Sequence, residues 1–287
     1  MLTKNMKKGI IAGCALTAGI VFSVVACDMK MTTATYRLST NKLHAPIRIV
    51  FISDLHNSLF GKDQSELIAE VEKAAPDIIV IGGDIADKTQ DYSPDNSYIL
   101  AEYLGNRYPC YYSMGNHEYA RGDSSLIKQK LGNYGIKVLQ GSGEVLTING
   151  QKIEICGIFD ADAYFEKDGE FINELEAVTA EKGSDRYRVL IAHFPEDIEE
   201  HLKGNFDLIL SGHAHGGQWR IPGVLNGIYA PGQGFFPKYA GGLYQHGDTW
   251  QIVSRGLWKP STIIAIPRVF NRPELVIADI IPEGTEE

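Results

Sequence analysis

The chain has 287 residues, of which 44% are hydrophobic and 22% are charged, values typical of a folded protein with a sizeable core. Its formal net charge is −9, from 36 acidic and 27 basic residues. An excess of negative charge repels polyanions, so nucleic acid is not expected as a partner. Length and composition exclude a disordered chain and indicate one large α/β domain or two modest ones.

Residues 1–27 form a separate N-terminal segment. Three lysines within the first eight residues precede an uncharged apolar stretch from Ile10 to Ala26, which ends in the sequence VVAC. This pattern predicts a signal peptide or a membrane anchor, with the domain that follows outside the cytoplasm. Three outcomes stay open: a lipoprotein acylated at Cys27, an uncleaved anchor, and secretion after cleavage at Ala26.

Residues 28–44 are polar and rich in threonine, and we expect them to tether the segment 1–27 to a single domain over residues 45–287. Two cysteines of that domain, Cys110 and Cys156, lie too far apart in sequence for a CxxC motif. We expect them to be buried thiols, and a single disulfide between them is the alternative.

Short apolar runs alternate with amphipathic patterns from residue 47 onward. A strand, a helix and a second strand over residues 47–83 form a β-α-β unit, which predicts parallel strands. Asn149-Gly150 predicts a hairpin over residues 143–159. Further strands are expected within residues 109–115, 187–193, 206–212, 244–256 and 273–281, and further helices within residues 93–107, 124–135 and 196–202. The expected fold is α/β, with two sheets packed together and helices outside, a four-layer α/β/β/α sandwich.

Polar residues with metal-binding side chains follow five of these apolar runs. Open α/β sheets bind ligands beyond the carboxyl ends of their strands, so we expect these residues to converge. Imidazole, carboxylate and carboxamide groups without a thiolate suit Mn, Fe or Zn. The residues are Asp54 and His56, Asp84, Asn116 and His117, His193, and His213 and His215. Without His117, seven candidates remain, more than one metal ion needs, so two divalent metal ions with a bridging carboxylate are expected.

Most of these motifs are weak signals when taken alone. An acid and a histidine at a strand end are common caps, and a lone histidine such as His193 is more often a core residue than a ligand. His213 and His215 favour metal binding, because they lie one residue apart and neighbouring glycines give the backbone unusual freedom. Five such motifs in this order are not expected by chance.

The ordered motifs D-x-H, GGD, GNHE, a lone histidine and GHAH resemble the motif set of the calcineurin-like metallophosphoesterase superfamily, over most of residues 47–218. The downstream sequences GGQ, PKYAGGLY and VSRG resemble a bacterial membrane-associated branch related to the UDP-2,3-diacylglucosamine hydrolases. The resemblance implies a metallo-dependent phosphatase-like fold. One departure is the sequence NSLFG after D-x-H, where many relatives have a glycine two residues after the motif; this difference bears on substrate fit.

The resemblance also implies a role for each candidate residue. One metal ion would be held by Asp54, His56 and His215, the other by Asn116, His193 and His213, with Asp84 bridging them. His117 would contact the phosphate and act as the general acid. The catalytic residues are therefore expected to be His117 and Asp84.

We expect a membrane-associated metal-dependent phosphoric ester hydrolase that cleaves a phosphodiester or a pyrophosphate with a metal-bridging hydroxide. Its substrate would be a phosphorylated small molecule or a lipid-linked one. In the lipid-linked case Phe235 and Phe236 would line an apolar approach and Lys238 would meet a phosphate; an aromatic loop packed on the second sheet is the alternative. A catalytically silent binding scaffold of the same fold is the alternative function. The chain lacks a G-x-S-x-G elbow and a Walker loop, which disfavours a serine hydrolase or an NTPase.

Overall fold

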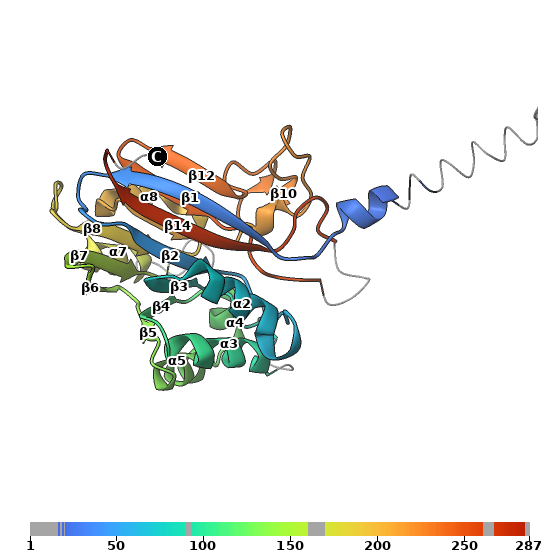
Figure 1. Cartoon of the computed structure of the whole chain (residues 1–287), viewed down its shortest axis with the longest axis horizontal. Coiled ribbons are helices and arrows are strands. Elements are labelled where there is room, and N and C mark those ends of the chain that lie inside the picture. Colours follow the sequence, from blue (N-terminus) through green and yellow to red (C-terminus); the bar gives the residue numbers. More distant parts are fainter. Residues whose placement is uncertain are drawn as a thin grey trace, which may run out of the picture.

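The computed structural model in Figure 1 describes residues 17, 19, 21–89, 93–159, 170–260 and 267–284. Two six-stranded sheets of mixed direction dominate it, and a two-stranded ribbon lies apart from both. The expected α/β class is therefore confirmed. The first sheet has the order β1 (Thr32–Thr40), β14 (Glu274–Pro282), β2 (Ile47–Ile52), β3 (Ile78–Gly82), β4 (Cys110–Ser113) and β5 (Lys137–Val138).

The second sheet contains the strands β6 to β9, β12 and β13. Its central strands β7, β8, β9 and β13 are parallel, and antiparallel strands close both edges. The order is β12 (Gly242–His246), β13 (Thr249–Val253), β9 (Leu208–Ser211), β8 (Tyr187–Ile191), β7 (Gln151–Gly157) and β6 (Ser142–Ile148). The separate ribbon pairs β10 (Tyr229–Ala230) with β11 (Gly234–Phe235).

Helices connect the parallel strands and cover the outer faces of the sheets. The α-helices are α2 (Ser65–Ala74), α3 (Asp95–Gly105), α4 (Asn116–Arg121), α5 (Ser124–Asn133), α7 (Glu170–Val178) and α8 (Ile198–His201). Short 3-10 turns are η1 (Lys62–Gln64), η2 (Pro195–Asp197), η3 (Leu202–Gly204) and η4 (His215–Gly217). The helical patterns expected within residues 64–75, 93–107, 124–135 and 196–202 are confirmed.

The central strands are buried on both faces, which explains why their sequences are continuous apolar runs. In β2, Ile49 and Phe51 pack into a core between the two sheets, whereas Val50 and Ile52 pack under the helices α2, α3 and α5. In the second sheet, Leu208 and Leu210 of β9 pack into the core between the sheets, whereas Ile209 faces outward. The outer face of β9 packs against α7 and α8. Three cores thus separate four layers in the order α/β/β/α.

Strand β1 differs from the polar tether that we expected over residues 28–44. Thr32–Thr40 pairs in parallel with β14 along its whole length, from Glu274 to Pro282. Leu38 is almost fully buried in the core between the sheets. The threonines that indicated polarity are also β-branched and favour a strand, and their partner strand lies more than 200 residues away in sequence. The position of the domain boundary otherwise stays a prediction.

Residues 21–26 are helical and end at Ala26, which is buried. Within the described residues there is no helix with the length and apolarity needed to cross a membrane. Apart from residues 17, 19 and 27, the rest of the segment 1–27 lies outside the described residues.

Two local expectations are confirmed. Strands β6 and β7 form the hairpin, and Asn149 and Gly150 both have positive φ angles at its turn, as a two-residue hairpin loop requires. Cys110 and Cys156 are free, buried thiols. Burial raises the pKa of the Cys156 thiol to about 12, so it is protonated at neutral pH.

Candidate metal centre

The carboxyl ends of five parallel strands bring the candidate residues together. Strands β2 and β3 lead to the loops that carry Asp54, His56 and Asp84. Strand β4 ends immediately before the start of α4, and β8 and β9 lead to the remaining histidines. Potential ligand atoms form three groups in which all atoms lie within 4.8 Å of one another: Asp54, His56 and His215; His56, Asp84 and His117; and Asp84, His193 and His213.

Asp84 belongs to two of these groups and lies between them. Its Oδ2 atom lies 3.2 Å from His193 Nε2 and 3.7 Å from His56 Nε2. Asp54 Oδ1 lies 3.8 Å from His215 Nε2 and 4.0 Å from His193 Nε2. These separations leave space for ions between the side chains and place Asp84 where it could contact both of two ions.

Each carboxylate has one oxygen held by the backbone of another motif. Asp54 Oδ1 accepts a hydrogen bond from the backbone N–H of His213 at 2.9 Å, and Asp84 Oδ1 accepts one from His117 at 2.8 Å. These bonds fix the orientation of the carboxylates, and in Asp84 the second oxygen, Oδ2, faces His193 and His56.

Several atoms that face the site have no hydrogen-bond partner within the described part of the chain: Asp54 Oδ2, Asp84 Oδ2, His56 Nε2 and Asn116 Oδ1. Asn116 is buried, and no other candidate residue in the set carries a carboxamide. A buried polar atom without a partner destabilises the fold by about 1–3 kcal/mol. Oxygen and imidazole nitrogen are ligands of Mn, Fe and Zn, so the donors fit divalent metal ions.

The backbone at the site is strained at five of the seven predicted ligands. Asp54, His56, Asp84, His213 and His215 have φ angles between 43° and 63°. Such angles are uncommon for residues other than glycine and are found mainly where function requires them. The strain turns each loop sharply after its strand, so that the side chain returns over the end of the sheet.

Two glycines allow the motifs to approach each other. A Cβ atom at Gly115 would lie 2.3 Å from Asp84 Oδ1, and one at Gly212 would lie 2.5 Å from Asp54 Oδ2. Any side chain at either position would displace a carboxylate. These two positions therefore require glycine because of packing against the predicted ligands.

Glu118 holds the loop of Asp84 in place through hydrogen bonds to its backbone. Its carboxylate accepts hydrogen bonds from the backbone N–H groups of Asp84, Ala86 and Gly115 at 2.8–3.0 Å. Burial raises the pKa of Glu118 to about 7, whereas these three donors favour its charged form. Glu118 is the last residue of the GNHE motif, but the motif by itself does not indicate this supporting role.

His193 is oriented by a hydrogen bond on the side away from the site. Its Nδ1 atom lies 2.7 Å from the carbonyl oxygen of Gly82. Because a carbonyl can only accept, Nδ1 carries a proton and Nε2 is the atom that faces Asp84. Metal-binding histidines are commonly oriented in this way.

The buried histidines of the site differ in protonation. Burial lowers the pKa of His56 to about 4 and that of His213 to about 3, and it also holds the pKa of His215 well below its usual range. These rings are neutral at pH 7. Neutral imidazole is the form that binds a metal ion.

His193 and Asp84 form an ionic pair in this structure. Burial disfavours the charged form of His193, but the negative charge of Asp84 raises its pKa to about 10. Burial likewise opposes ionisation of Asp84, and the positive charge on His193 holds its pKa well below the usual range. A metal ion would replace the proton of His193, so metal binding at this position releases a proton.

His117 lies at the opening of the site, and its side chain is 21% exposed, the largest value among the ion-paired histidines. Its Nε2 atom lies 3.9 Å from Asp84 Oδ2, and its Nδ1 atom lies 3.3 Å from Asp87 Oδ1. Burial opposes the charged form, but the carboxylates of Asp87 and Asp84 raise the pKa of His117 above its usual value. Asp87 was missed in the sequence, although it follows Asp84 by only three residues.

The loop that carries His215 is supported by residues that the sequence analysis also missed. Asn271 donates hydrogen bonds to the carbonyl oxygens of His215 and Gln218. Arg268 is fully buried and donates to the backbone carbonyl of Asn271. The ring of Trp258 lies 5.5 Å from that of His215. No motif marks these residues, because they reach the site from the far end of the chain.

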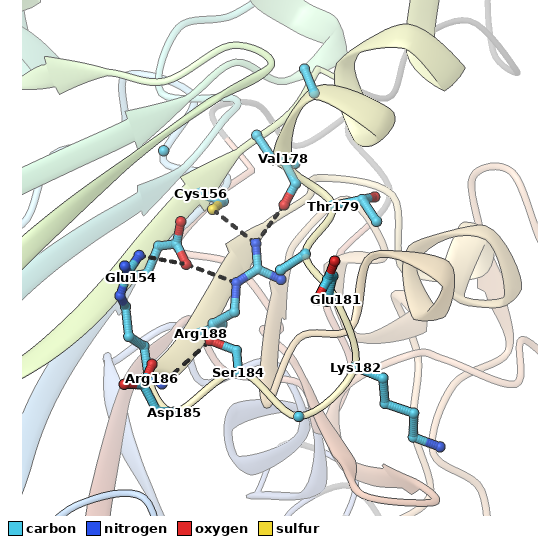
Figure 2. Close-up of a pocket in the computed structure, with 14 residues that line it drawn as sticks. Glu154, Cys156, Val178, Thr179, Glu181, Lys182, Ser184, Asp185, Arg186 and Arg188 are labelled. Atoms are coloured by element: carbon cyan, nitrogen blue, oxygen red, sulfur yellow. Dashed lines mark hydrogen bonds and ion pairs between the residues drawn. The ribbon is translucent and has the colours of Figure 1, made fainter.

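A cavity of about 660 Å³ lies at the opposite end of the second sheet and contains none of the predicted ligands. Figure 2 shows Arg188 at its centre, with the guanidinium directed at Glu154, Cys156 and Val178. Arg188 belongs to the start of β8, whereas His193 follows the end of the same strand. The cavity is therefore separate from the metal centre.

Comparison with known proteins identifies the class. The sequence profile of the calcineurin-like phosphoesterase family matches residues 47–217, which is more than half of the chain and contains every predicted ligand. The protein belongs to this family, whose members are metal-dependent hydrolases of phosphoesters, and the expected superfamily is confirmed.

Individual relatives have sequence identities of about 30% to this chain. An uncharacterized metallophosphoesterase of Helicobacter pylori is 30% identical over 85% of this chain, which spans 62% of that protein. Phosphodiesterase YaeI of Escherichia coli is 28% identical over 83% of each chain. Among solved structures, the NAD nucleotidase of Haemophilus influenzae is similar over 78% of this chain and 49% of its own, with a TM-score of 0.48 and 17% identity.

Proposed function

We propose that the protein hydrolyses phosphodiesters with two divalent metal ions bound at the ends of strands β2, β3, β4, β8 and β9. The observation that carries this proposal is that two buried carboxylate oxygens, Asp54 Oδ2 and Asp84 Oδ2, accept no hydrogen bond and lie within a cluster of histidines. The structure contains no other described cluster of this kind. The name of the E. coli relative supports a diester as the substrate.

The grouping of the side chains supports two ions rather than one. Asp54, His56 and His215 would hold the first ion, and these residues form one of the three groups. Asn116, His193 and His213 would hold the second, and Asp84 would contact both. Asp84 belongs to a group with His193 and His213 and to another with His56, as a bridging ligand requires.

Metal ions bound here would lower the pKa of a water molecule and neutralise the charge of the phosphoryl oxygens. The protein itself supplies the proton for the leaving group. His117 follows the predicted ligand Asn116 and lies at the opening of the site. Asp87 both orients its ring and favours its protonated form. A substrate that enters from solvent meets this imidazolium first, so His117 would protonate the leaving alkoxide.

We propose a phosphorylated small molecule as the substrate and the segment 1–27 as a signal or anchor that places the domain outside the cytoplasm. The uncharged stretch Ile10–Ala26 after three lysines supports this location. The sequences GGQ, PKYAGGLY and VSRG support a relation to the branch of the UDP-2,3-diacylglucosamine hydrolases, whose substrate would be lipid-linked.

The test is turnover of bis-p-nitrophenyl phosphate by the wild type, by Asp84→Asn and by a control, Asp248→Asn, whose side chain is exposed in the β12–β13 turn. The proposal predicts activity with added Mn, Fe or Zn, none after chelation, none in Asp84→Asn and full activity in the control. Wild-type protein that binds less than one metal ion per chain and has no turnover would instead identify a silent binding scaffold.

A further inference from the structure

Exposed hydrophobic side chains are concentrated at one end of the molecule. Of the fourteen large ones that are exposed in the described part of the chain, ten belong to two short segments. Four lie on the helix of residues 21–26, namely Val21, Phe22, Val24 and Val25. Six lie between residues 219 and 236 and are named here the apolar rim: Trp219, Ile221, Val224, Tyr229, Phe235 and Phe236. Single exposed hydrophobic residues are normal, but a contiguous patch marks an interaction site.

Residues 269 and 270 link the helix of residues 21–26 to the rim. The ring of Phe22 lies 5.5 Å from that of Phe270, whose backbone N–H donates to the carbonyl oxygen of Ala26. The neighbouring residue, Val269, forms a β-bridge with Trp219. The two exposed apolar segments are thus connected through residues 269 and 270, and Figure 1 shows both at the same end of the molecule, near β10.

Backbone hydrogen bonds and a ring contact link parts of the rim. The backbone of Ile228 donates to the carbonyl oxygen of Trp219, and that of Phe236 donates to the carbonyl oxygen of Ile228. The rings of Tyr229 and Phe235 lie 5.4 Å apart. Phe236 is 69% exposed and has a φ angle of 57°, which is strained for a bulky residue. An exposed phenylalanine held in a strained backbone indicates that its outward position has a use.

The rim borders the metal centre. Its first residue, Trp219, follows the turn η4 that begins with the predicted ligand His215. The backbone of Ile228 also donates to the carbonyl oxygen of Gly217, in the same turn. A surface that binds the rim would therefore lie beside the opening of the site.

We propose that the apolar rim docks on a lipid bilayer, so that the metal centre opens next to the membrane surface. The bilayer is favoured over another protein because the rim is continuous with the helix that ends the uncharged stretch Ile10–Ala26. The composition also fits: tryptophan, tyrosine and phenylalanine with flanking lysines concentrate at membrane interfaces, and Lys30 and Lys238 are exposed beside the two segments.

Docking rests on the rim and on the apolar helix linked to it, but its consequence for substrate rests on the proposed function. A phosphoesterase that opens at the bilayer would reach phosphorylated lipids or lipid-linked diphosphates at the headgroup level. Soluble diesters would still reach the site, because docking places a membrane beside the opening without adding any group to it.

The tryptophans provide the test, since the chain has only three. Full-length protein is reconstituted into phosphatidylcholine–phosphatidylglycerol vesicles, with or without brominated acyl chains that quench tryptophan at the bilayer. Trp250→Phe/Trp258→Phe leaves Trp219 in the rim. Trp219→Phe/Trp258→Phe leaves Trp250, the second residue of β13 in the second sheet. Trp250 pairs there with Leu208, the first residue of β9. Brominated lipid is expected to remove most of the Trp219 emission and little of the Trp250 emission. Equal quenching of the two would overturn the proposal.

A second pair of variants tests the rim residues directly. Phe235→Ser/Phe236→Ser in the Trp219 background is expected to lower the quenching to the level of Trp250, and Leu126→Ser, an exposed residue of α5, is expected to leave it unchanged. If Trp219 is protected because the chain dimerises, sedimentation will show the dimer and docking is contradicted. Turnover of bis-p-nitrophenyl phosphate in detergent reports on the catalytic proposal separately, so quenching without turnover would reject only the latter.

Discussion

Arg188 lies near the start of strand β8 and His193 lies just after its end, and both side chains are 1% exposed. The guanidinium of Arg188 is fully partnered: it pairs with Glu154 at 2.8 Å and donates to the carbonyl oxygens of Gly204, Asn205 and Val178. At the other end, two carboxylate oxygens and a carboxamide oxygen are buried and accept no hydrogen bond. A buried charged group whose donors all have hydrogen-bond partners typically has a structural role. Buried polar atoms that have no hydrogen-bond partner indicate instead that a ligand binds to them.

The largest effect is expected from a change at the open end. Asp54→Asn keeps an oxygen that can accept from the N–H of His213 but removes the negative charge beside His215. Turnover of bis-p-nitrophenyl phosphate is expected to fall by about 10³-fold or more, since several kcal/mol of charge stabilisation are lost. Thermal unfolding of the metal-free variant should occur no lower than in the wild type. A clear loss of metal-free stability would contradict the assignment of this end to function.

At the partnered end the same kind of change should act on stability instead. Arg188→Met removes the buried partner of Glu154 and the donors to three carbonyl groups, so the free energy of unfolding is expected to fall by about 3–5 kcal/mol. Urea unfolding measures the loss. The half-exposed neighbour Arg186, which is 3.9 Å from Glu154, is the control, and Arg186→Met should change the stability by less than about 1 kcal/mol. The folded Arg188→Met protein should retain its turnover, and a specific loss of kcat would overturn the contrast.

Glu118 has features of both ends of the strand. Its buried carboxylate accepts three hydrogen bonds, yet it supports the loop of Asp84 in the candidate metal centre. In Glu118→Gln an amide replaces one of the two oxygens that receive N–H groups from Asp84, Ala86 and Gly115. Metal affinity is expected to weaken by about 10–100-fold, as for other residues that orient ligands. Metal titration of the apoprotein measures this shift. An unchanged affinity would show that the loop of Asp84 is held by other contacts.

The smallest effect concerns the pH profile. The pKa of His117 is raised by Asp87 and Asp84, and a general acid must be protonated to act. Activity is therefore present below this pKa and is lost as the pH rises through it. Asp87→Asn removes one of the charges that raise the pKa, so the alkaline fall of kcat should move to lower pH. Identical profiles for wild type and variant would exclude Asp87 as the residue that positions and charges His117.

The positions of the candidate ligands could be predicted from sequence for two reasons. Buried parallel strands appear in the sequence as apolar runs, and the carboxyl ends of such strands lie at the same edge of a sheet. Glu118, Asp87 and Asn271 could not be assigned in the same way. Their roles depend on how loops return after the strands, and Asn271 meets His215 across 56 residues. The sequence does not reveal strand β1, because its partner strand is remote and because threonine is both polar and β-branched, so its presence indicates a polar tether as readily as a strand. The strained backbone of the ligand loops leaves no signal in composition.

Metal content of the purified full-length protein tests the central claim most directly. After loading with Mn, Fe or Zn and removal of free metal, the wild type is expected to retain two ions per chain. Asp84→Asn should retain fewer, and Asp248→Asn should match the wild type. A wild-type chain that retains less than one ion, or that hydrolyses bis-p-nitrophenyl phosphate equally well after chelation, would contradict a two-metal centre formed by the buried open atoms of Asp54 and Asp84.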